Sequence, residues 1–127
     1  MKIVMGSDDK KFIRKKHFGE SRFYIVFEID NGEILNREVR ENITFEGDEH
    51  GHGQSGEVMK LLSDCSIFIG RSMGKKSMQN ISRKGIKCII SGIEDIEETV
   101  KAYISEDGKS FKYFNAESDS LISCFEE

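Results

Sequence analysis

Short apolar runs separated by glycine and polar residues predict a series of strands along the chain. Residues 1–6, "MKIVMG", form an apolar run that ends at a Gly-Ser-Asp-Asp stretch, which is typical of a buried strand. Residues 22–30, "RFYIVFEID", are rich in aromatic and β-branched residues, and Asn31-Gly32 leads into the alternating pattern of residues 33–42, "EILNREVREN". Because an Asn-Gly pair between two such runs is the strongest short-range hairpin signal, we predict a β-hairpin here.

The second half of the chain alternates between helix-like and strand-like patterns. Val58, Leu61, Leu62 and Cys65 fall on one face of a helix-period segment that follows the loop "ITFEGDEHGHGQSG". The further elements are a strand over 65–70, a weakly periodic helix over 70–85, a strand over 86–91 and a helix over 94–108. Two consecutive strand–helix units imply parallel strands joined by helical crossovers.

These elements predict a single α/β domain with a mixed five-stranded sheet. Numbered along the chain, the strands take the order 3-2-1-4-5, with the second strand antiparallel to the first. The domain is expected to span residues 1–108. The pattern of residues 109–127 leaves open whether this tail packs as an extra element or remains loose.

The length, charge and cysteine content of the chain limit the classes of protein to which it can belong. The 127 residues suit one domain, and 19 Lys plus Arg against 23 Asp plus Glu give a net charge of −4, which provides no general electrostatic case for nucleic-acid binding. No apolar run approaches the roughly 20 residues that span a bilayer, and the N-terminus lacks the features of a secretory peptide. The three cysteines form neither a disulfide framework nor a CxxC pair. We therefore expect a cytoplasmic protein with reduced thiols.

The predicted topology brings several polar loops to one edge of the sheet. Open α/β sheets bind ligands in the crevice outside the carboxyl ends of their strands. In this sheet that crevice falls between the first and fourth strands, and all three histidines of the chain should face it. The loops at this edge are Ser7 to Asp9, His17 to Gly19, His50 to Gly53, Gly70 to Gly74, and Ser91 to Gly92.

Histidines in a glycine-rich setting are candidate metal ligands. His50 and His52 alternate with glycines in "EHGHGQ", and His17 stands in "KKHFGES". Imidazole is the commonest metal ligand and suits iron and zinc, and neighbouring glycines allow a bulky group to approach the backbone. The alternative interpretation is an exposed loop whose histidines bind nothing.

Thiols are the usual ligands of iron–sulfur clusters, but few are available at this edge. Cys65 opens the fourth strand at the opposite edge, and Cys88 lies in mid-strand, where it is expected to pack as a small hydrophobic residue. Only Cys124, in the tail, could reach the histidines. A cluster would then depend on histidine together with Cys124, Met73 or an external ligand, and such binding should be weak and transferable.

The stretch "GRSMGKKS" at the start of a predicted helix favours an anion. Free N–H groups and the helix dipole attract negative charge there, aided by Arg71, Lys75 and Lys76. The stretch is one residue short of a P-loop, so a simpler anion site or an ordinary solvated helix start fits better than nucleotide hydrolysis.

A two-metal nuclease is not supported. Such an enzyme needs several carboxylates that converge from separate strands, and the fourth and fifth strands carry none. Asp8 and Asp9 are expected to be turn or capping residues.

Several stretches resemble one known family, the dinitrogenase iron-molybdenum cofactor biosynthesis family. They are "MKIVMGSDD", "KHFGES", "FYIVFEIDNGE", "HGHG", "DCSIFIGRSMGKKSMQNISRKGIKCI" and "IEETVKAYIS", and together they cover Met1 to about Ser105. The family includes small NifX-type carriers and the C-terminal domain of the radical enzyme of cofactor synthesis. The resemblance implies a ribonuclease-H-like α/β fold and, for several members, the binding of iron–sulfur or iron–molybdenum cluster precursors for transfer.

The resemblance places specific residues in the site. His17, Phe18 and Gly19 match the family's His-Phe-Gly motif, and Gly70 and Gly74 match its glycine loop. Family versions of that loop are usually richer in glycine and less charged than "GRSMGKKS".

Together these observations predict a non-enzymatic carrier or scaffold for an iron–sulfur or iron–molybdenum cluster precursor, related to nitrogen fixation. It would receive the cluster from a donor protein and release it to an acceptor protein by ligand exchange. The predicted binding residues are His17, Gly19, Gly70, Arg71, Met73, Gly74 and Lys75, and the predicted metal ligands are His17, His50, His52 and Cys124. The alternative is a small-anion or nucleotide-binding regulatory module that uses the same edge of the sheet.

Overall fold

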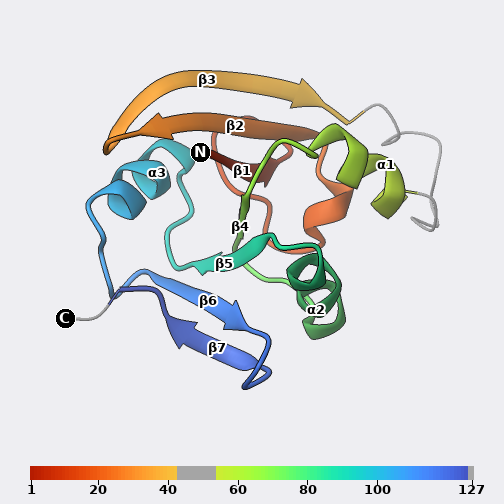
Figure 1. Ribbon diagram of the computed structural model, residues 1–127. Helices are drawn as coiled ribbons and strands as arrows, with labels where there is room; N and C mark the ends of the chain where they lie inside the picture. The colour runs from red at the N-terminus through yellow and green to blue at the C-terminus, as the bar shows by residue number, and fades with distance from the viewer. Residues whose placement is uncertain (43–53, 126–127) are drawn as a thin grey trace.

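A computed structural model describes residues 1–42 and 54–125 of the chain, and it is built around one mixed sheet. Figure 1 shows the sheet with helices on both of its faces. The strand order β3-β2-β1-β4-β5 confirms the predicted sheet, and two further strands, β6 and β7, extend it beyond β5. The elements are β1 (Lys2–Ser7), η1 (Phe18–Glu20, a 3₁₀ turn), β2 (Phe23–Asp30), β3 (Glu33–Glu41), α1 (Gln54–Leu61), β4 (Ile67–Gly70), α2 (Lys75–Arg83), β5 (Lys87–Ser91), α3 (Ile96–Ile104), β6 (Phe111–Asn115) and β7 (Ser120–Ser123).

The predicted hairpin is confirmed as β2 and β3. The two strands pair antiparallel, and Asn31 and Gly32 both adopt positive φ (52° and 76°), as a tight turn matched to strand twist requires. β1 pairs antiparallel with β2 and parallel with β4, and β4 pairs parallel with β5. The carboxyl ends of β1, β4 and β5 therefore lie at one edge of the sheet, as the sequence predicted.

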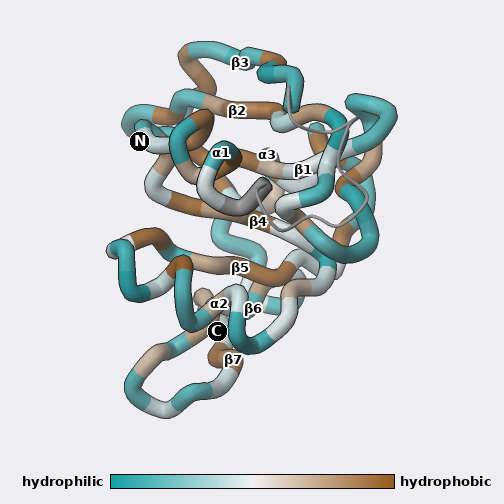
Figure 2. The backbone as a smooth tube through the Cα atoms, turned by 90° about the vertical axis from the view of Figure 1, so that its right-hand side faces the viewer, coloured by the Kyte–Doolittle hydropathy of each residue, from teal (hydrophilic) through white to brown (hydrophobic). Residues whose placement is uncertain are grey.

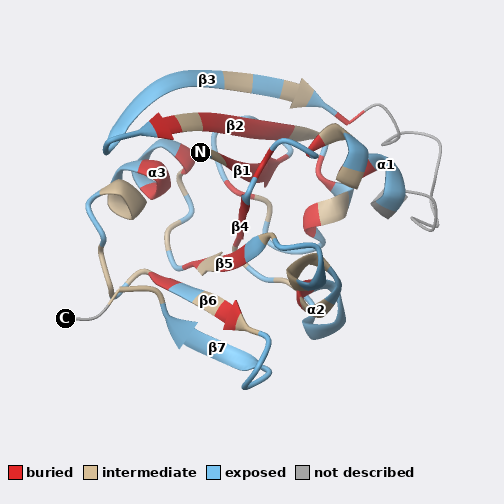
Figure 3. Cartoon of the chain, in the orientation of Figure 1, coloured by how far each residue is buried: buried red, intermediate tan, exposed pale blue. Residues whose placement is uncertain are grey.

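One face of the sheet is closed by α3. Alternate strand residues such as Met5, Phe27 and Ile89 belong to a single buried cluster that includes Ile96 and Val100 of α3. Asp95 begins the helix: its carboxylate accepts a hydrogen bond from the backbone N–H of Glu98 (2.9 Å), and this bond lowers the pKa of Asp95. In Figure 3 the buried residues run through β1, β2 and β4 at the centre of the molecule.

The opposite face carries two helices and two separate clusters. Val58 and Leu62, in α1 and just after it, pack on Val4, Tyr24 and Phe68. In a separate cluster, α2 contributes Met78, which packs on the β5–β6 side of the sheet. The sequence periodicity through Met78 therefore marks a real helix face, although a short one.

The tail packs as an extra element. β6 pairs antiparallel with β5, and β7 pairs antiparallel with β6, so the hairpin of residues 111–123 completes the sheet. Figure 2 shows the strands stacked from β3 at one end to β7 at the other. No helix in the described part of the chain has the length and apolar character that a bilayer crossing requires.

Candidate functional site

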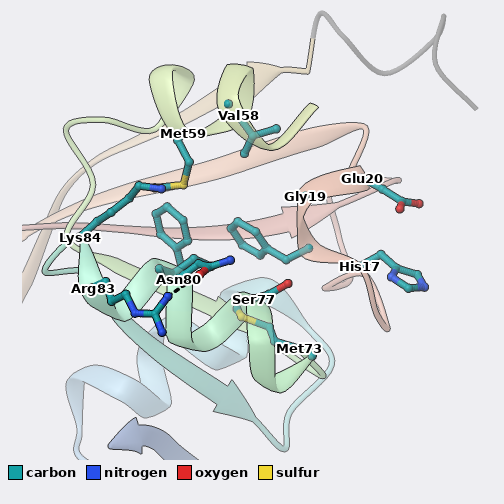
Figure 4. A pocket seen from close by; sticks show the side chains of 15 residues that line it. His17, Gly19, Glu20, Val58, Met59, Met73, Ser77, Asn80, Arg83 and Lys84 are labelled. Carbon is teal, nitrogen blue, oxygen red and sulfur yellow. Dashed lines mark hydrogen bonds between the residues drawn. The ribbon is translucent and has the colours of Figure 1, made fainter. Parts of the chain in front are cut away.

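A large pocket opens on the two-helix face, between η1, α1 and α2 (Figure 4). Its volume is about 960 Å³, at the upper end of the roughly 300–1,000 Å³ that small-molecule and cofactor sites occupy. The lining residues come from three separated parts of the chain, residues 17–20, 56–59 and 68–84. They are His17, Phe18, Gly19, Glu20, Gly56, Val58, Met59, Phe68, Met73, Gly74, Ser77, Asn80, Ile81, Arg83 and Lys84.

Two stacked rings form the apolar floor of the pocket. The Phe18 ring lies 5.0 Å from that of Phe68 at an interplanar angle of 18°, and 5.3 Å from that of Tyr24. The buried Tyr24 hydroxyl donates to the Phe18 carbonyl (2.9 Å), and the Ser21 hydroxyl donates to the same oxygen (2.8 Å). Burial raises the pKa of Tyr24, so its hydroxyl remains a donor. Phe18 is therefore held at both its ring and its carbonyl.

A glycine in β1 allows this turn to sit directly against the sheet. A Cβ on Gly6 would lie 2.1 Å from the Ser21 Oγ, far inside van der Waals contact. The Ser21 hydroxyl that holds Phe18 thus depends on the missing side chain at position 6.

His17 stands at the mouth of the pocket. It adopts the left-handed conformation (φ 60°, ψ 62°) immediately before η1, and its side chain is exposed. In Figure 4 its imidazole points away from Met59 and Lys84, which lie toward the other end of the pocket. The His-Phe-Gly motif therefore combines a buried anchor, Phe18, with an exposed imidazole.

The far end of the pocket is cationic, and sequence reasoning missed it. Arg83 and Lys84 line it from the end of α2, and an Arg83 Nη1 donates to the Asn80 side-chain oxygen (3.0 Å). Ser77, Asn80, Ile81 and Lys84 follow the i, i+3, i+4, i+7 spacing of one helix face, so the sequence groups Lys84 with other lining residues. The spacing does not include Arg83, and it does not tell which face lines a pocket.

Two thioethers complete the lining. Met59 comes from α1, and Met73 from the loop before α2. A Cβ on Gly70 would lie 3.0 Å from the Met73 methyl carbon and 3.9 Å from the Phe18 ring. Gly70, buried at the end of β4, thus leaves room for Met73 beside the apolar floor.

The structure brings only part of the predicted set to the pocket. His17, Gly19, Met73 and Gly74 line it, and Gly70 lies beneath Met73. His50 and His52 lie outside the described residues. Within the described residues, no three His, Cys, Asp or Glu side chains come together as a metal site.

Arg71 and Lys75, the two cations predicted to bind the ligand, make their contacts outside the large pocket. The Lys75 ammonium pairs with Asp119 in the β6–β7 turn (2.8 Å). Arg71 lines a separate cleft of about 250 Å³, where its Nη1 lies 3.7 Å from the Glu94 carboxylate. Neither belongs to the lining of the large pocket.

The thiols also lie away from the pocket. Cys124 packs against the cluster on the α3 face, and its backbone N–H donates to the Phe111 carbonyl (3.2 Å). Its position on the opposite face of the sheet separates it from His17. Burial raises the pKa of Cys88 to about 12 and, with the nearby Asp64 carboxylate, that of Cys65 to about 11. Both thiols are core residues, as expected for Cys88.

Asp8 and Asp9 are structural residues, as predicted. The Asp9 carboxylate accepts from the backbone N–H groups of Lys11 and Phe12 (both 2.9 Å), and these bonds lower its pKa. Asp8 pairs with Arg14. The two carboxylates therefore fix the loop after β1.

Comparison with known proteins supports the same fold and identifies the family. A curated protein of Methanocaldococcus jannaschii, uncharacterized protein MJ0580, is 28% identical over 113 residues, covering 89% of this chain and 92% of that protein. The crystal structure of PH0822 superposes with a TM-score of 0.66 at 24% identity, covering 83% of this chain and 89% of the other. The apo form of the orange protein from Desulfovibrio gigas superposes with a TM-score of 0.59 at 18% identity, covering 86% and 89%.

The family pattern described as "Dinitrogenase iron-molybdenum cofactor" matches residues 1–106, which include β1 to α3 and the whole lining of the pocket. The hairpin of β6 and β7 lies beyond the match. This chain belongs to the dinitrogenase iron-molybdenum cofactor family.

Proposed function

We propose that this protein is a non-enzymatic carrier of an iron–sulfur or iron–molybdenum cluster precursor in the cytoplasm. The cluster is cargo: it binds in the pocket between η1, α1 and α2, and it passes from a donor protein to an acceptor protein by ligand exchange. The observation that supports this most directly is a roomy pocket, in a chain of this family, with an imidazole at its mouth and two cations at its far end.

The charges in the pocket suit an anionic cargo. Arg83 and Lys84 place two positive groups at one end of a largely apolar cavity, where a cluster bearing negative charge would be attracted. Glu20, near the mouth, is the only carboxylate among the lining residues described.

The donor atoms in the pocket suit transfer rather than permanent retention. Within the described residues the lining offers the His17 imidazole, the Glu20 carboxylate and the thioethers of Met59 and Met73, and no thiol. Imidazole and thioether bind iron less firmly than thiolate does. A cluster held by so few protein ligands would keep external ligands, which an acceptor protein can replace.

A second candidate is a small-anion or nucleotide-binding regulatory module. It is favoured by the stacked Phe18–Phe68 floor, which could take a planar ring, beside two cations that could take a phosphate. In this case His17 would be an incidental polar group.

The test is anaerobic reconstitution with iron and sulfide, read by visible absorption and bound iron. The native chain should acquire a chromophore, His17→Ala should lose most of it, and Arg83→Gln should weaken retention several-fold. Lys109→Gln, an exposed cation outside the pocket, is the matched control and should behave as the native chain.

A native chain that stays colourless and iron-free would eliminate the carrier. Titration with ATP then examines the second candidate. Saturable binding that Arg83→Gln reduces and His17→Ala leaves unchanged would support the regulatory module.

A further inference from the structure

β3 is an open edge of the sheet. It pairs with β2 along one side through eight of its nine residues, all but Leu35 at a register shift, and no described strand pairs with its other side. Figures 1 and 2 both show it as the outermost strand, with no other described element beyond it. Such an edge presents a row of N–H and C=O groups that can pair with another strand.

Symmetry restricts how a second copy could add to this edge. Two identical strands related by a two-fold axis pair antiparallel, and the same face of each sheet continues across the junction. Residues directly opposite must then share a face, so the axis passes through one residue that lies opposite itself.

A two-fold axis at Val39 places opposite charges of the two copies of β3 opposite each other. With the axis at Val39, Arg37 lies opposite Glu41 of the second copy, and Glu38 lies opposite Arg40. Each of these pairings occurs twice, and all join opposite charges, which stabilises cross-strand neighbours. Val39, 39% exposed in the single chain, would be covered by its own counterpart.

Neighbouring registers lack this complementarity. Moving the axis by one residue, to Glu38 or to Arg40, places two like charges opposite each other. Like charges directly opposite destabilise a pair of strands. The charge pattern therefore selects one register among those close to the centre of the strand.

The Arg37 and Glu41 charges are the accessible ones. The Arg40 side chain is 13% exposed and already contacts Glu38 (3.1 Å) and Asp64 (2.7 Å) of its own chain, so the Arg37–Glu41 pairs carry the complementarity. Glu41 is exposed and has no ion pair within the described part of the chain. The Arg37 side chain is 38% exposed, and its Nε contacts Glu97 of α3 (2.7 Å), which leaves other N–H groups of the guanidinium for a second carboxylate.

We propose that β3 is a homodimer interface, in which two copies pair this strand antiparallel about Val39 and join their sheets into one. The partner is a second copy of this chain. The interface uses the outer edge of the sheet and none of the residues that line the pocket, so it stands independently of the carrier function.

Charge reversal and rescue test the proposal on the full chain by sedimentation equilibrium over a wide range of protein concentration. The native chain should dimerise. Arg37→Glu or Glu41→Arg alone converts two attractive pairs to repulsive ones and should weaken the dimer by about tenfold or more. The double variant Arg37→Glu/Glu41→Arg restores opposite charges and should recover the dimer.

Mixing the two single variants gives the most specific test of this register. The two single variants should each be mainly monomeric but should form a heterodimer with each other, because the carboxylates of one face the guanidinium groups of the other. Lys112→Glu, a charge reversal on the interior strand β6, is the control and should leave the native dimer unchanged. Circular dichroism of each variant verifies that it is folded.

Three results would overturn the proposal. One is a native chain that remains monomeric at all concentrations. Another is a dimer that both single reversals leave intact. The third is a dimer that only Ile122→Lys dissociates, since Ile122 lies on β7 at the other open edge and is 38% exposed.

Discussion

The two faces of the sheet are built from the same strands but are covered differently. On the α3 face a single buried cluster runs from Phe27 of β2 to Phe111 of β6. On the other face α1 packs over β1 and β2, and α2 packs toward β5 and β6, with Phe18 and Phe68 between them. The α3 face is thus closed by one continuous cluster, and the divided face leaves a pocket.

The difference shows how a small sheet can hold a ligand without a second domain. Helices α1 and α2 are eight and nine residues long and pack on different parts of the same face, so a pocket remains between them. The floor of this pocket is formed by the buried rings of Phe18 and Phe68, and Figure 4 shows the pocket from close by. The predictions below test this contrast, from the largest expected effect to the smallest.

Replacing a phenylalanine by alanine should lower the free energy of unfolding more on the closed face than on the divided face. Phe27→Ala, at a side chain 1% exposed, should lower the free energy of unfolding by about 3–5 kcal/mol, because an enclosed cavity is left. Phe18→Ala should cost about 2 kcal/mol, because its void merges with the open pocket. Urea denaturation measures both. Equal losses would contradict the contrast between the faces.

A methyl group added at the base of the pocket should be harmful at one glycine and harmless at another. Gly6→Ala forces the Ser21 hydroxyl away from the Phe18 carbonyl and should cost about 1–3 kcal/mol. Gly19→Ala is the matched control, since nothing lies within 4 Å of the added carbon. Thermal unfolding compares them. If both variants melt as the native chain does, the close packing of the η1 turn on β1 is not needed for stability.

An ion pair beside α1 should make the stability of the divided face fall in acid. Asp64, beside α1, accepts hydrogen bonds from Arg40 (2.7 Å) and Lys2 (2.9 Å), and these bonds lower its pKa. Its contribution, about 0.5–1 kcal/mol for a partly exposed ion pair, is complete above the unfolded pKa of about 4 and is lost as the pH falls toward the lower folded pKa. Asp64→Asn should therefore be less stable at neutral pH and should lose less stability on acidification.

The control for the acid experiment is Asp30→Asn, which removes an exposed carboxylate with no ion pair in the described part of the chain. Urea denaturation at a series of pH values gives the slope for each protein. An Asp64→Asn slope that matches the native one would show that the Arg40–Asp64 pair does not stabilise the divided face.

The order of the strands was predictable from sequence because each piece of it rests on local signals. The Asn-Gly turn defined the hairpin, and the alternation of apolar runs with helix periodicity defined the parallel strands. The tail was undecided because the strand of residues 120–123 is polar at both ends and exposed throughout, so it has no burial pattern. Its pairing with β6 comes from backbone hydrogen bonds, which leave little trace in the sequence.

The candidate site was predicted only in part. His17, Gly19, Met73 and Gly74 could be placed near the ligand because strand ends and their loops gather at one edge. Arg83 and Lys84 were missed because they lie at the far end of a helix, where only its rotation decides which side chains enter the pocket. Lys75, which was predicted to bind the ligand, does not line the pocket and instead pairs with Asp119, a residue distant in sequence.

The sequence by itself thus determined the class of fold, the hairpin and the edge of the sheet where loops converge, since periodicity and turn chemistry act over a few residues. Only the tertiary structure decided that Phe18 anchors the turn, that Cys124 lies on the opposite face from His17, and that the end of α2 supplies the cations. These outcomes depend on contacts between segments far apart in the chain. Such contacts are set by how whole elements pack, and no local pattern of residues encodes them.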